Sequence, residues 1–280
     1  MLKKFFRATV FFLLSIVLLT GALFVYAVKI EPYRLQIQSL TFQTDLSEDL
    51  KIVQISDVQI RESFTAKHFD KVVEMINQQA PDLVLFTGDL YENYAEHHED
   101  AALIDALCAI QASYGKYAIW GNRDYGGGAV HHYPSILEKS GFQILRNDWV
   151  SIMPEKGKTL FLAGLDDALL GSPDESPVRN ARQSAEPGFS ILMTHEPDVA
   201  DSFVDAGFDL ILAGHSHGGQ VNLPFWSQPT TALARKYTRG LYRLSEQTNL
   251  YVNAGIGTSR YPVRFGVVPE ITVFHLMGKK

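Results

Sequence analysis

Short apolar runs alternate with amphipathic stretches through most of this chain, and this alternation limits the folds that it can adopt. Lys51–Ser56, Leu83–Phe86 and Tyr117–Trp120 have the length and composition of buried strands. Apolar residues from Phe69 to Ile76 recur at helical spacing, and so do those of residues 99–112. Strands that alternate with helices predict a sheet covered by helices on both faces. We therefore expect an α/β fold.

The second half continues this alternation and then changes. Strands are expected around residues 160–162, 190–193 and 210–212, with a helix over residues 197–206. Three later apolar runs follow one another without helices between them, at residues 241–243, 251–253 and 271–274. The chain should therefore end in a β-rich segment.

The first thirty residues differ from the rest. Lys3, Lys4 and Arg7 precede an uncharged run, Ala8–Val28. A run of this length can cross the roughly 30 Å hydrocarbon core of a bilayer as a helix. Basic residues in front of it favour a cytoplasmic N-terminus. We predict a single-pass anchor in the cell membrane, with the following domain outside the cytoplasm.

Two features leave the fate of this segment open. Lys29 and Arg34 follow the apolar run and weaken the charge bias. Val25–Ala27 also has the small-x-small pattern of a signal-peptide cleavage site, although the apolar run is longer than a usual signal core. A cleaved signal is therefore the alternative to a retained anchor, and a buried soluble helix is a third possibility.

Composition excludes some other classes. The 280 residues are 46% apolar and carry a net charge of −6, which does not favour a nucleic-acid partner. Cys108 is the single cysteine, so no disulfide can form within the chain. Its spacing from Leu103 and Leu107 in the expected helix predicts a small core residue.

Most of the predicted strands end in a polar cluster. The clusters are Ser56–Gln59, Gly88–Asp89, Gly121–Asp124, Thr194–Glu196 and Gly214–His217. Ligands of open α/β sheets bind beyond the carboxyl ends of the strands. Alone, an Asp after a strand is more often a helix cap and a His is more often a satisfied polar residue. Five clusters at strand ends together predict a dinuclear metal site, because carboxylate oxygen and imidazole nitrogen suit Mn²⁺, Fe and Zn²⁺.

These motifs resemble those of the calcineurin-like metallophosphoesterase family, whose pattern is D-x-H, GD, GNH-D/E, a single His and G-H-x-H. The resemblance covers about residues 50–276. Further segments resemble a membrane- or wall-associated bacterial branch of the YkuE/YaeI type, namely Leu165–Asp167, Thr194–Asp198, Gly214–Gln220 and Arg264–Ile271. The resemblance implies a four-layer α/β/β/α sandwich behind an N-terminal transmembrane helix. It divides the chain into an anchor (1–28), a connector with the first strand (29–50) and a metallophosphoesterase domain (51–280).

The resemblance also implies a role for each polar position. Asp89 would bridge two divalent ions. The ligands completing one ion would be Asp57, Gln59 and His217, and those completing the other would be Asn122, His195 and His215. A bridging hydroxide would attack phosphorus in line. Mn²⁺ is the expected metal, with Zn²⁺, Fe and Mg²⁺ as alternatives.

Two positions depart from the family pattern. Gln59 replaces a His, and its neutral carbonyl oxygen suits harder ions such as Mn²⁺ or Mg²⁺ better than imidazole does. Arg123 also replaces a His, and it cannot donate a proton near neutrality because its pKa is above about 12. Arg123 and Asp124 are the catalytic candidates, and Arg123 should clamp phosphate oxygens. The alternative is a structural ion pair between Arg123 and Asp124 or another carboxylate.

The resemblance, together with these two departures, implies a hydrolase of phosphodiesters or phosphoanhydrides. Its partners would be a membrane and a phosphate-containing small molecule or lipid- or wall-linked substrate. The sequence GNRD at 121–124 also occurs in UDP-2,3-diacylglucosamine pyrophosphatases of lipid A synthesis, which would need a cytoplasmic site. A non-catalytic metal-binding relative is the other alternative.

Two smaller features carry expectations as well. Asp166–Asp167 should cap a turn, with substrate contact as the alternative. Arg260, Tyr261 and Arg264 are expected on a solvated face, with a basic lip for an anionic head group as the alternative.

Overall fold

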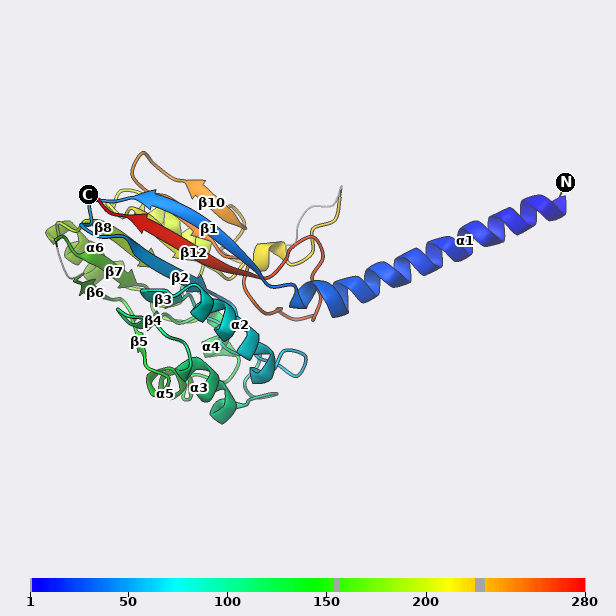
Figure 1. Cartoon of the computed structure of the whole chain (residues 1–280), viewed down its shortest axis with the longest axis horizontal. Helices are drawn as coiled ribbons and strands as arrows, with labels where there is room; N and C mark the ends of the chain where they lie inside the picture. Colours follow the sequence, from blue (N-terminus) through cyan, green and yellow to red (C-terminus); the bar gives the residue numbers. More distant parts are fainter. Residues whose placement is uncertain (1, 154–156, 225–229, 280) are drawn as a thin grey trace.

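The computed structural model describes residues 2–153, 157–224 and 230–279. Helix α1 (Leu2–Val25) continues through a π-helical turn (Tyr26–Ile30) and a 3-10 turn (Glu31–Tyr33), and it projects away from the rest of the chain (Figure 1). The helix is long and apolar enough to cross a membrane, and its most apolar part is exposed. These properties fit a signal sequence or a single membrane anchor.

The first sheet has six strands. Their spatial order is β1 (Gln36–Gln43), β12 (Glu270–Met277), β2 (Leu50–Ile55), β3 (Leu83–Phe86), β4 (Lys116–Ala118) and β5 (Phe142–Ile144). Strands β2 to β5 are parallel, whereas β12 is parallel to β1 and antiparallel to β2. The last strand of the chain therefore lies between the first two.

The second sheet also has six strands. Their order is β10 (Gly240–Arg243), β11 (Asn249–Val252), β9 (Leu210–Ala213), β8 (Phe189–Met193), β7 (Leu160–Gly164) and β6 (Asp148–Ile152). The four central strands are parallel and the two outer strands are antiparallel to their neighbours. Both sheets are therefore mixed, and the strands expected from the sequence are confirmed.

Alternating side chains on each strand separate three apolar cores, because successive residues of a strand point to opposite faces. Val53 and Ile55 of β2 pack under the helices α2 (Ala66–Gln78), α3 (Asp100–Cys108) and α5 (Tyr133–Lys139). Ile52, on the other face of β2, packs between the two sheets. The outer face of the second sheet packs against α6 (Glu175–Ser184) and the 3-10 segment Pro197–Phe203.

Two local expectations are wrong. The segment after Glu196 is a 3-10 helix that ends at Phe203, so the α-helix predicted over 197–206 does not form. Cys108 is exposed rather than buried. The buried positions of α3 include Leu103 and Leu107, and Cys108 comes one residue, or about 100° of helical turn, after Leu107. That rotation takes its thiol out of the apolar stripe.

The chain direction places the strand ends relative to α1. Strand β1 starts three residues after the 3-10 turn that follows α1, and its first residue Gln36 pairs with Glu270. Since β2 runs antiparallel to β12, its carboxyl end returns towards the base of α1, as do the parallel ends of β3 and β4. The loops at residues 214–224 and 253–268 lie at the same end (Figure 1).

Candidate metal centre

The predicted ligands sit on sharp backbone turns at the strand ends. Five of them have positive φ angles between 47° and 66°: Asp57, Gln59, Asp89, His215 and His217. Residues with side chains rarely adopt this region, and such strain concentrates at functional sites. These backbone conformations follow closely after the strands, and side chains from different strands converge at one place.

The first group consists of Asp57, Gln59 and His217. Asp57 Oδ2 accepts hydrogen bonds from the Ser56 hydroxyl at 2.6 Å and from the His215 backbone N–H at 2.9 Å. Its other oxygen, Oδ1, lies 3.4 Å from His217 Nε2. The Gln59 amide nitrogen lies 3.0 Å from the same His217 nitrogen. Three polar side chains thus converge from β2 and from the loop after β9.

The second group contains His195 and His215, whose ring centroids are 5.0 Å apart. The Nδ1 of His195 donates to the Thr87 carbonyl at 2.7 Å, so its Nε2 is left to act as a ligand. The Nε2 of His215 donates to the Ala232 carbonyl at 2.9 Å, which leaves its Nδ1. Backbone carbonyls therefore fix both imidazoles in the orientation that a metal ligand needs. Asn122 lies on the wall of the same cavity.

Asp89 lies between the two groups. Its Oδ2 is 3.2 Å from the Gln59 amide nitrogen, and its Oδ1 is 3.5 Å from His195 Nε2. Gly121 allows this close approach, because a Cβ at that position would lie 2.6 Å from Asp89 N and 2.8 Å from His195 Cε1. The two oxygens of one carboxylate therefore face the two groups, as a bridging ligand requires.

Unpaired polar atoms test whether these residues fit a metal centre. Within the described residues, five buried ligand-set atoms have no hydrogen-bond partner: Asp57 Oδ1, Gln59 Oε1, Asn122 Oδ1, His195 Nε2 and His217 Nδ1. A buried polar atom without a partner costs about 1–3 kcal/mol, so this concentration at one place needs a compensating ligand. Ligand atoms of Asp57, Asp89 and His195 all lie within 4.8 Å of one another. The donor set fits divalent cations.

Burial and neighbouring charges together determine the protonation of the three imidazoles. Burial and the positive charge of Arg264 lower the pKa of His217 to about 3, and burial also lowers the pKa of His215. Both rings are therefore neutral near pH 7, the form that binds a metal. Burial also lowers the pKa of His195, but the charge of Asp89 outweighs it and holds that pKa well above the usual range. A cation bound there would displace this proton.

Asp124 is fully buried and holds the loops together. Its two oxygens accept backbone N–H groups of Asp89, Leu90 and Gly121, each at 2.9 Å. Burial and the charge of Asp89 raise its pKa to about 8. This carboxylate therefore positions the turn that carries Asp89, and it does so from behind the cavity.

Arg123 lines the cavity wall with 28% of its side chain exposed. Its Nη2 donates to the Ser259 hydroxyl at 3.0 Å and lies 3.5 Å from Glu92 Oε1. An ion pair with a carboxylate does form, and its partner is Glu92 rather than Asp124. Sequence reasoning missed Glu92 and Ser259. The only signal for Glu92 was an acidic residue three positions after Asp89.

The cavity above these ligands has a volume of about 890 Å³. Its polar floor includes Gln59, Asp89 and His217, and its rim includes Leu170 and Tyr261, whose side chains are 55% and 73% exposed. A space of this size can take a small molecule or the head of a larger one. The site thus combines a cluster of cation ligands, an arginine and an open cavity.

Comparison with known proteins identifies this arrangement. Residues 50–219 match the calcineurin-like phosphoesterases. The chain belongs to this family. It is 37% identical to the uncharacterized metallophosphoesterase YkuE of Bacillus subtilis over 92% of this chain and 91% of that protein. Members of the calcineurin-like family hydrolyse phosphoester bonds, and the family implies a dinuclear metal site.

One further relative and one solved structure are less similar to this chain. The chain is 29% identical to a "Transmembrane protein with metallophosphoesterase domain" of Danio rerio, over 80% of this chain and 52% of that protein. Its fold is similar to that of the purple acid phosphatase PPD1 of yellow lupin, at 13% identity and a TM-score of 0.46, over 79% of this chain and 46% of that structure.

The smaller expectations have mixed outcomes. Asp167 caps a turn as expected, since its Oδ2 accepts the backbone N–H groups of Leu170 and Gly171. Arg260 is exposed on the cavity rim. The solvated position expected for Arg264 is wrong, because its side chain is fully buried. Its guanidinium donates to the carbonyls of Ala254 and Gly255, which replace water.

Replacing Gln59 with histidine should restore the usual ligand of the family and tighten binding of a transition metal at the first group. Histidine is among the residues that tolerate the positive φ of this position, so the turn should persist. Titration of the purified chain with Zn²⁺ should give at least a tenfold lower Kd for Gln59→His, because imidazole is the softer donor. Equal Kd values in the two proteins would contradict a ligand role for Gln59.

Proposed function

We propose that this chain is a membrane-anchored, metal-dependent hydrolase of phosphodiesters or phosphoanhydrides on lipid- or wall-linked molecules. The position of the cavity carries this proposal. The proposed ligands follow strands that end towards the base of α1 (Figure 1). The cavity that these residues line is therefore at the same end of the molecule as the apolar helix. A membrane that held α1 would lie next to the cavity.

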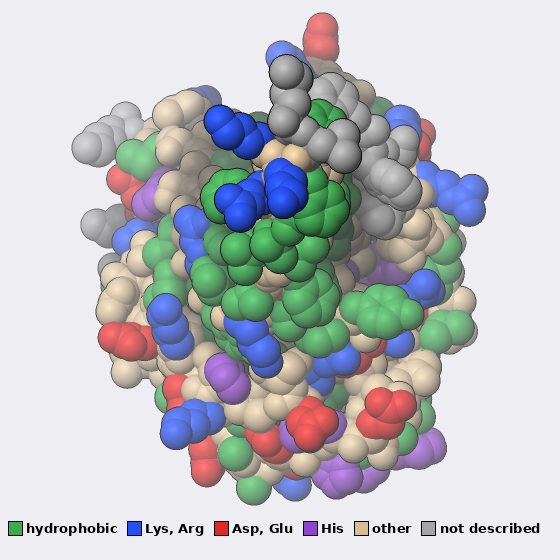
Figure 2. All heavy atoms as spheres, turned by 90° about the vertical axis from the view of Figure 1, so that its right-hand side faces the viewer, with side chains coloured by type: hydrophobic (Ala, Val, Ile, Leu, Met, Phe, Trp, Pro, Cys, Tyr) green, Lys and Arg blue, Asp and Glu red, His purple; other side chains and the backbone are tan. Residues whose placement is uncertain are grey.

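Contacts at the base of α1 support a fixed orientation. The Arg264 backbone N–H donates to the Ala27 carbonyl at 2.9 Å, and Glu31 accepts the Val267 N–H at 2.8 Å. The same loop contains Ser259 and Arg260 of the cavity wall. Figure 2 views this end of the molecule along the projecting hydrophobic helix, and Lys and Arg side chains lie on the domain surface beside the helix, with Asp and Glu side chains further from it. The basic side chains beside the helix suit a membrane with anionic groups.

The proposal includes the division of the chain. Residues 1–28 would be a retained single-pass anchor, 29–50 a connector and 51–280 the metallophosphoesterase domain outside the cytoplasm. The printed name of the Danio rerio relative, a transmembrane protein, supports the anchor over a cleaved signal. Anchoring would raise the local concentration of substrates in or near the membrane without any new contact.

Each residue of the site has a proposed task. Asp57, Gln59 and His217 would hold one ion, Asn122, His195 and His215 the other, and Asp89 both. When bound, two divalent cations supply Lewis-acid chemistry, acidifying water and neutralising phosphate charge. We favour Mn²⁺ because a carboxamide oxygen and imidazoles share the ligand set. Asp124 would keep the Asp89 turn in place.

Arg123 shapes the choice of leaving group. Its guanidinium reaches the cavity from a fixed base, since Glu92 and Ser259 hold one of its nitrogens. It can donate two parallel hydrogen bonds to a phosphate but cannot protonate a leaving oxygen. The favoured substrates should therefore be phosphoanhydrides and aryl esters, which leave as weakly basic anions.

A substrate panel with Mn²⁺ tests this function. The wild-type chain should hydrolyse a nucleoside diphosphate-sugar and bis-p-nitrophenyl phosphate well and an alkyl phosphodiester poorly. Arg123→Ala should lower kcat/KM on the first two by about a hundredfold, because one charged donor to the transition state is lost. The exposed Arg243, changed to alanine, is the matched control and should leave both rates unchanged. A wild-type preference for the alkyl diester would contradict the role given to Arg123.

The GNRD sequence favours one second candidate, a nucleotide-sugar pyrophosphatase of the UDP-2,3-diacylglucosamine type. Such an enzyme needs its site in the cytoplasm. A reporter enzyme fused after residue 280 distinguishes the two, because an active cytoplasmic reporter would favour the pyrophosphatase. A chain that binds Mn²⁺ but hydrolyses nothing on the panel would instead be a non-catalytic metal-binding relative.

A further inference from the structure

A second cavity lies at the foot of α1, outside the metal site. It has a volume of about 250 Å³ and mostly apolar walls. Its lining comes from the segment after α1, from α2 and the turn before it, and from the two ends of the loop between β11 and β12. The residues are Pro32, Tyr33, Leu35, Phe64, Lys67, His68, Lys71, Val72, Ile256 and Pro269. We call it the anchor groove.

Aromatic contacts and a hydrogen bond build one wall of the anchor groove. The His68 ring lies 5.5 Å from the Tyr33 ring and 5.7 Å from the Phe64 ring, measured between centroids. The Tyr33 hydroxyl donates to the Ser63 carbonyl at 2.8 Å. The wall is therefore held in place by contacts between segments that are distant in sequence, and it is a formed apolar surface.

The position of the anchor groove relative to a membrane follows from its distance along the chain from α1. The apolar run ends at Val28, and Pro32 follows four residues later, or about 6 Å further along a helix. The polar layer of a bilayer is about 5–7 Å thick on each side of the hydrocarbon core. If α1 spans a membrane, the groove lies at the depth of the lipid phosphates.

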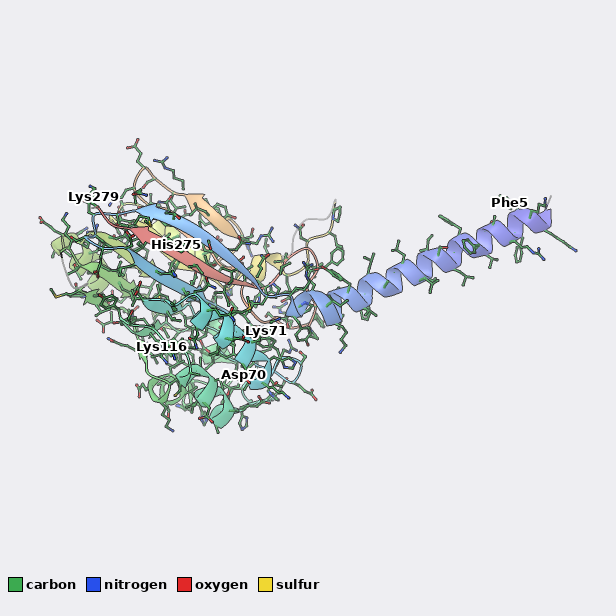
Figure 3. The ribbon with its side chains drawn as sticks, viewed as in Figure 1. Phe5, Asp70, Lys71, Lys116, His275 and Lys279 are labelled. Carbon is green, nitrogen blue, oxygen red and sulfur yellow. The ribbon has the colours of Figure 1, made fainter. Side chains whose placement is uncertain are left out.

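Two lysines give the groove positive charge, which complements lipid phosphates at this depth. Lys67 and Lys71 are exposed and lie one helical turn apart on α2, on the side that lines the groove. Figure 3 places Lys71 nearer the base of α1 than Asp70 is. The lining residues of the groove include two lysines and no Asp or Glu. An apolar slot with paired ammonium groups matches an anionic amphiphile.

We infer that the anchor groove binds the head-group end of one anionic phospholipid, with the first acyl-chain carbons against Leu35, Phe64 and Val72 and the phosphate between Lys67 and Lys71. The bound lipid would join α2 to the foot of α1 and so fix the tilt of the domain over the membrane. This site is distinct from the metal cavity. The inference rests on the proposed anchor and not on the proposed catalysis.

Native mass spectrometry of the full chain in detergent micelles tests it. Phosphatidylglycerol should be retained at least about tenfold more strongly than phosphatidylcholine, since each lysine near a lipid phosphate favours the anionic lipid. Lys67→Glu with Lys71→Glu should weaken phosphatidylglycerol retention by about 30-fold. Glycerol 3-phosphate should not compete, because it lacks the acyl chains.

The matched control reverses two other exposed lysines, Lys139 and Lys279, with the same change in net charge. Lys279 lies at the opposite end of the molecule from α1 (Figure 3). This control should retain phosphatidylglycerol as the wild type does. Equal retention by the Lys67/Lys71 variant, equal retention of both lipids, or displacement by glycerol 3-phosphate would each overturn the inference. Because binding is read by mass, a chain that hydrolyses nothing would count against the proposed function alone.

Discussion

Replacement of Asp89 by asparagine should lower kcat on bis-p-nitrophenyl phosphate by at least about a thousandfold. Asp89 is the residue whose two oxygens face both ligand groups, one towards Gln59 and the other towards His195. The asparagine side chain has the same shape as aspartate but no charge, and an NH₂ group replaces one of the two carboxylate oxygens. Its single oxygen can bind at most one of the two cations, so the other cation should be lost.

The same change should weaken the metal-free fold only slightly. Burial disfavours the charge of Asp89, but His195 and the Arg123 backbone N–H outweigh burial and hold the pKa of Asp89 below its usual value, so this charge stabilises the fold near neutral pH. Asparagine loses that pairing, but it also removes the repulsion from Asp124, whose pKa burial and the charge of Asp89 raise to about 8. In the presence of a chelator, the Tm of Asp89→Asn should therefore lie slightly below that of the wild type. The rise in Tm that Mn²⁺ gives the wild type should shrink, because ligand binding stabilises only a state that binds it.

Asp70→Asn is the matched control, since Asp70 is an exposed carboxylate on α2. It should change neither kcat nor the Mn²⁺-dependent rise in Tm. Hydrolysis assays with bis-p-nitrophenyl phosphate measure kcat, and thermal melting measures Tm. Both are carried out with Mn²⁺ and with chelator. An Asp89→Asn protein with more than a tenth of wild-type kcat would contradict the bridging position of Asp89.

The residues of the candidate metal centre could be located from the sequence because each closely follows a local apolar run. Asp57, Asp89 and His215 come shortly after strands that the pattern indicates unaided, and a parallel sheet brings such strand ends to one edge. The sequence also shows that Gln59 replaces a histidine. It does not show that the amide oxygen of Gln59 is unpaired, because the orientation of this amide depends on His217, which is 158 residues away.

The rest of the site depends on contacts that no local pattern records. Glu92 pairs with Arg123 only because the turn after Asp89 folds back beside α4 (Asn122–Gly126). The position of β12 between β1 and β2 also depends on pairing between strands that are far apart in the sequence, which no local pattern predicts. The predicted solvent exposure of Arg264 was wrong for a different reason. Arginine is almost never fully buried unless it is paired, so its burial required partners from the fold.

Those partners are backbone carbonyls. The Arg264 guanidinium donates to Ala254 O at 2.9 Å, to Gly255 O at 3.0 Å and to Gly257 O. The carboxylates of Asp57 and Glu270 offset part of its charge, while burial lowers its pKa to about 10. The guanidinium therefore stays charged near neutral pH and holds a loop whose carbonyls would otherwise be buried without donors.

This loop supports the candidate metal centre. The Gly257 N–H donates to the Asp57 carbonyl at 2.7 Å, and the Ile256 N–H donates to the Ser56 carbonyl at 3.0 Å. Through its own backbone N–H, Arg264 also joins the loop to Ala27 at the end of α1. A single buried side chain thus links the turn that carries Asp57 to the foot of the projecting helix.

Arg264→Met should consequently lower the free energy of unfolding by about 3–5 kcal/mol, the usual cost of leaving buried polar partners uncompensated. Methionine fills a similar volume but donates no hydrogen bond, so the loss reports the guanidinium and not a cavity. Mn²⁺ affinity should fall as well, because the Asp57 turn loses its support. Urea unfolding of the full chain in micelles and Mn²⁺ titration measure the two effects. Arg260→Met, on the exposed rim of the same loop, should change stability by less than about 0.5 kcal/mol, and an equal loss in the two variants would refute the role given to Arg264.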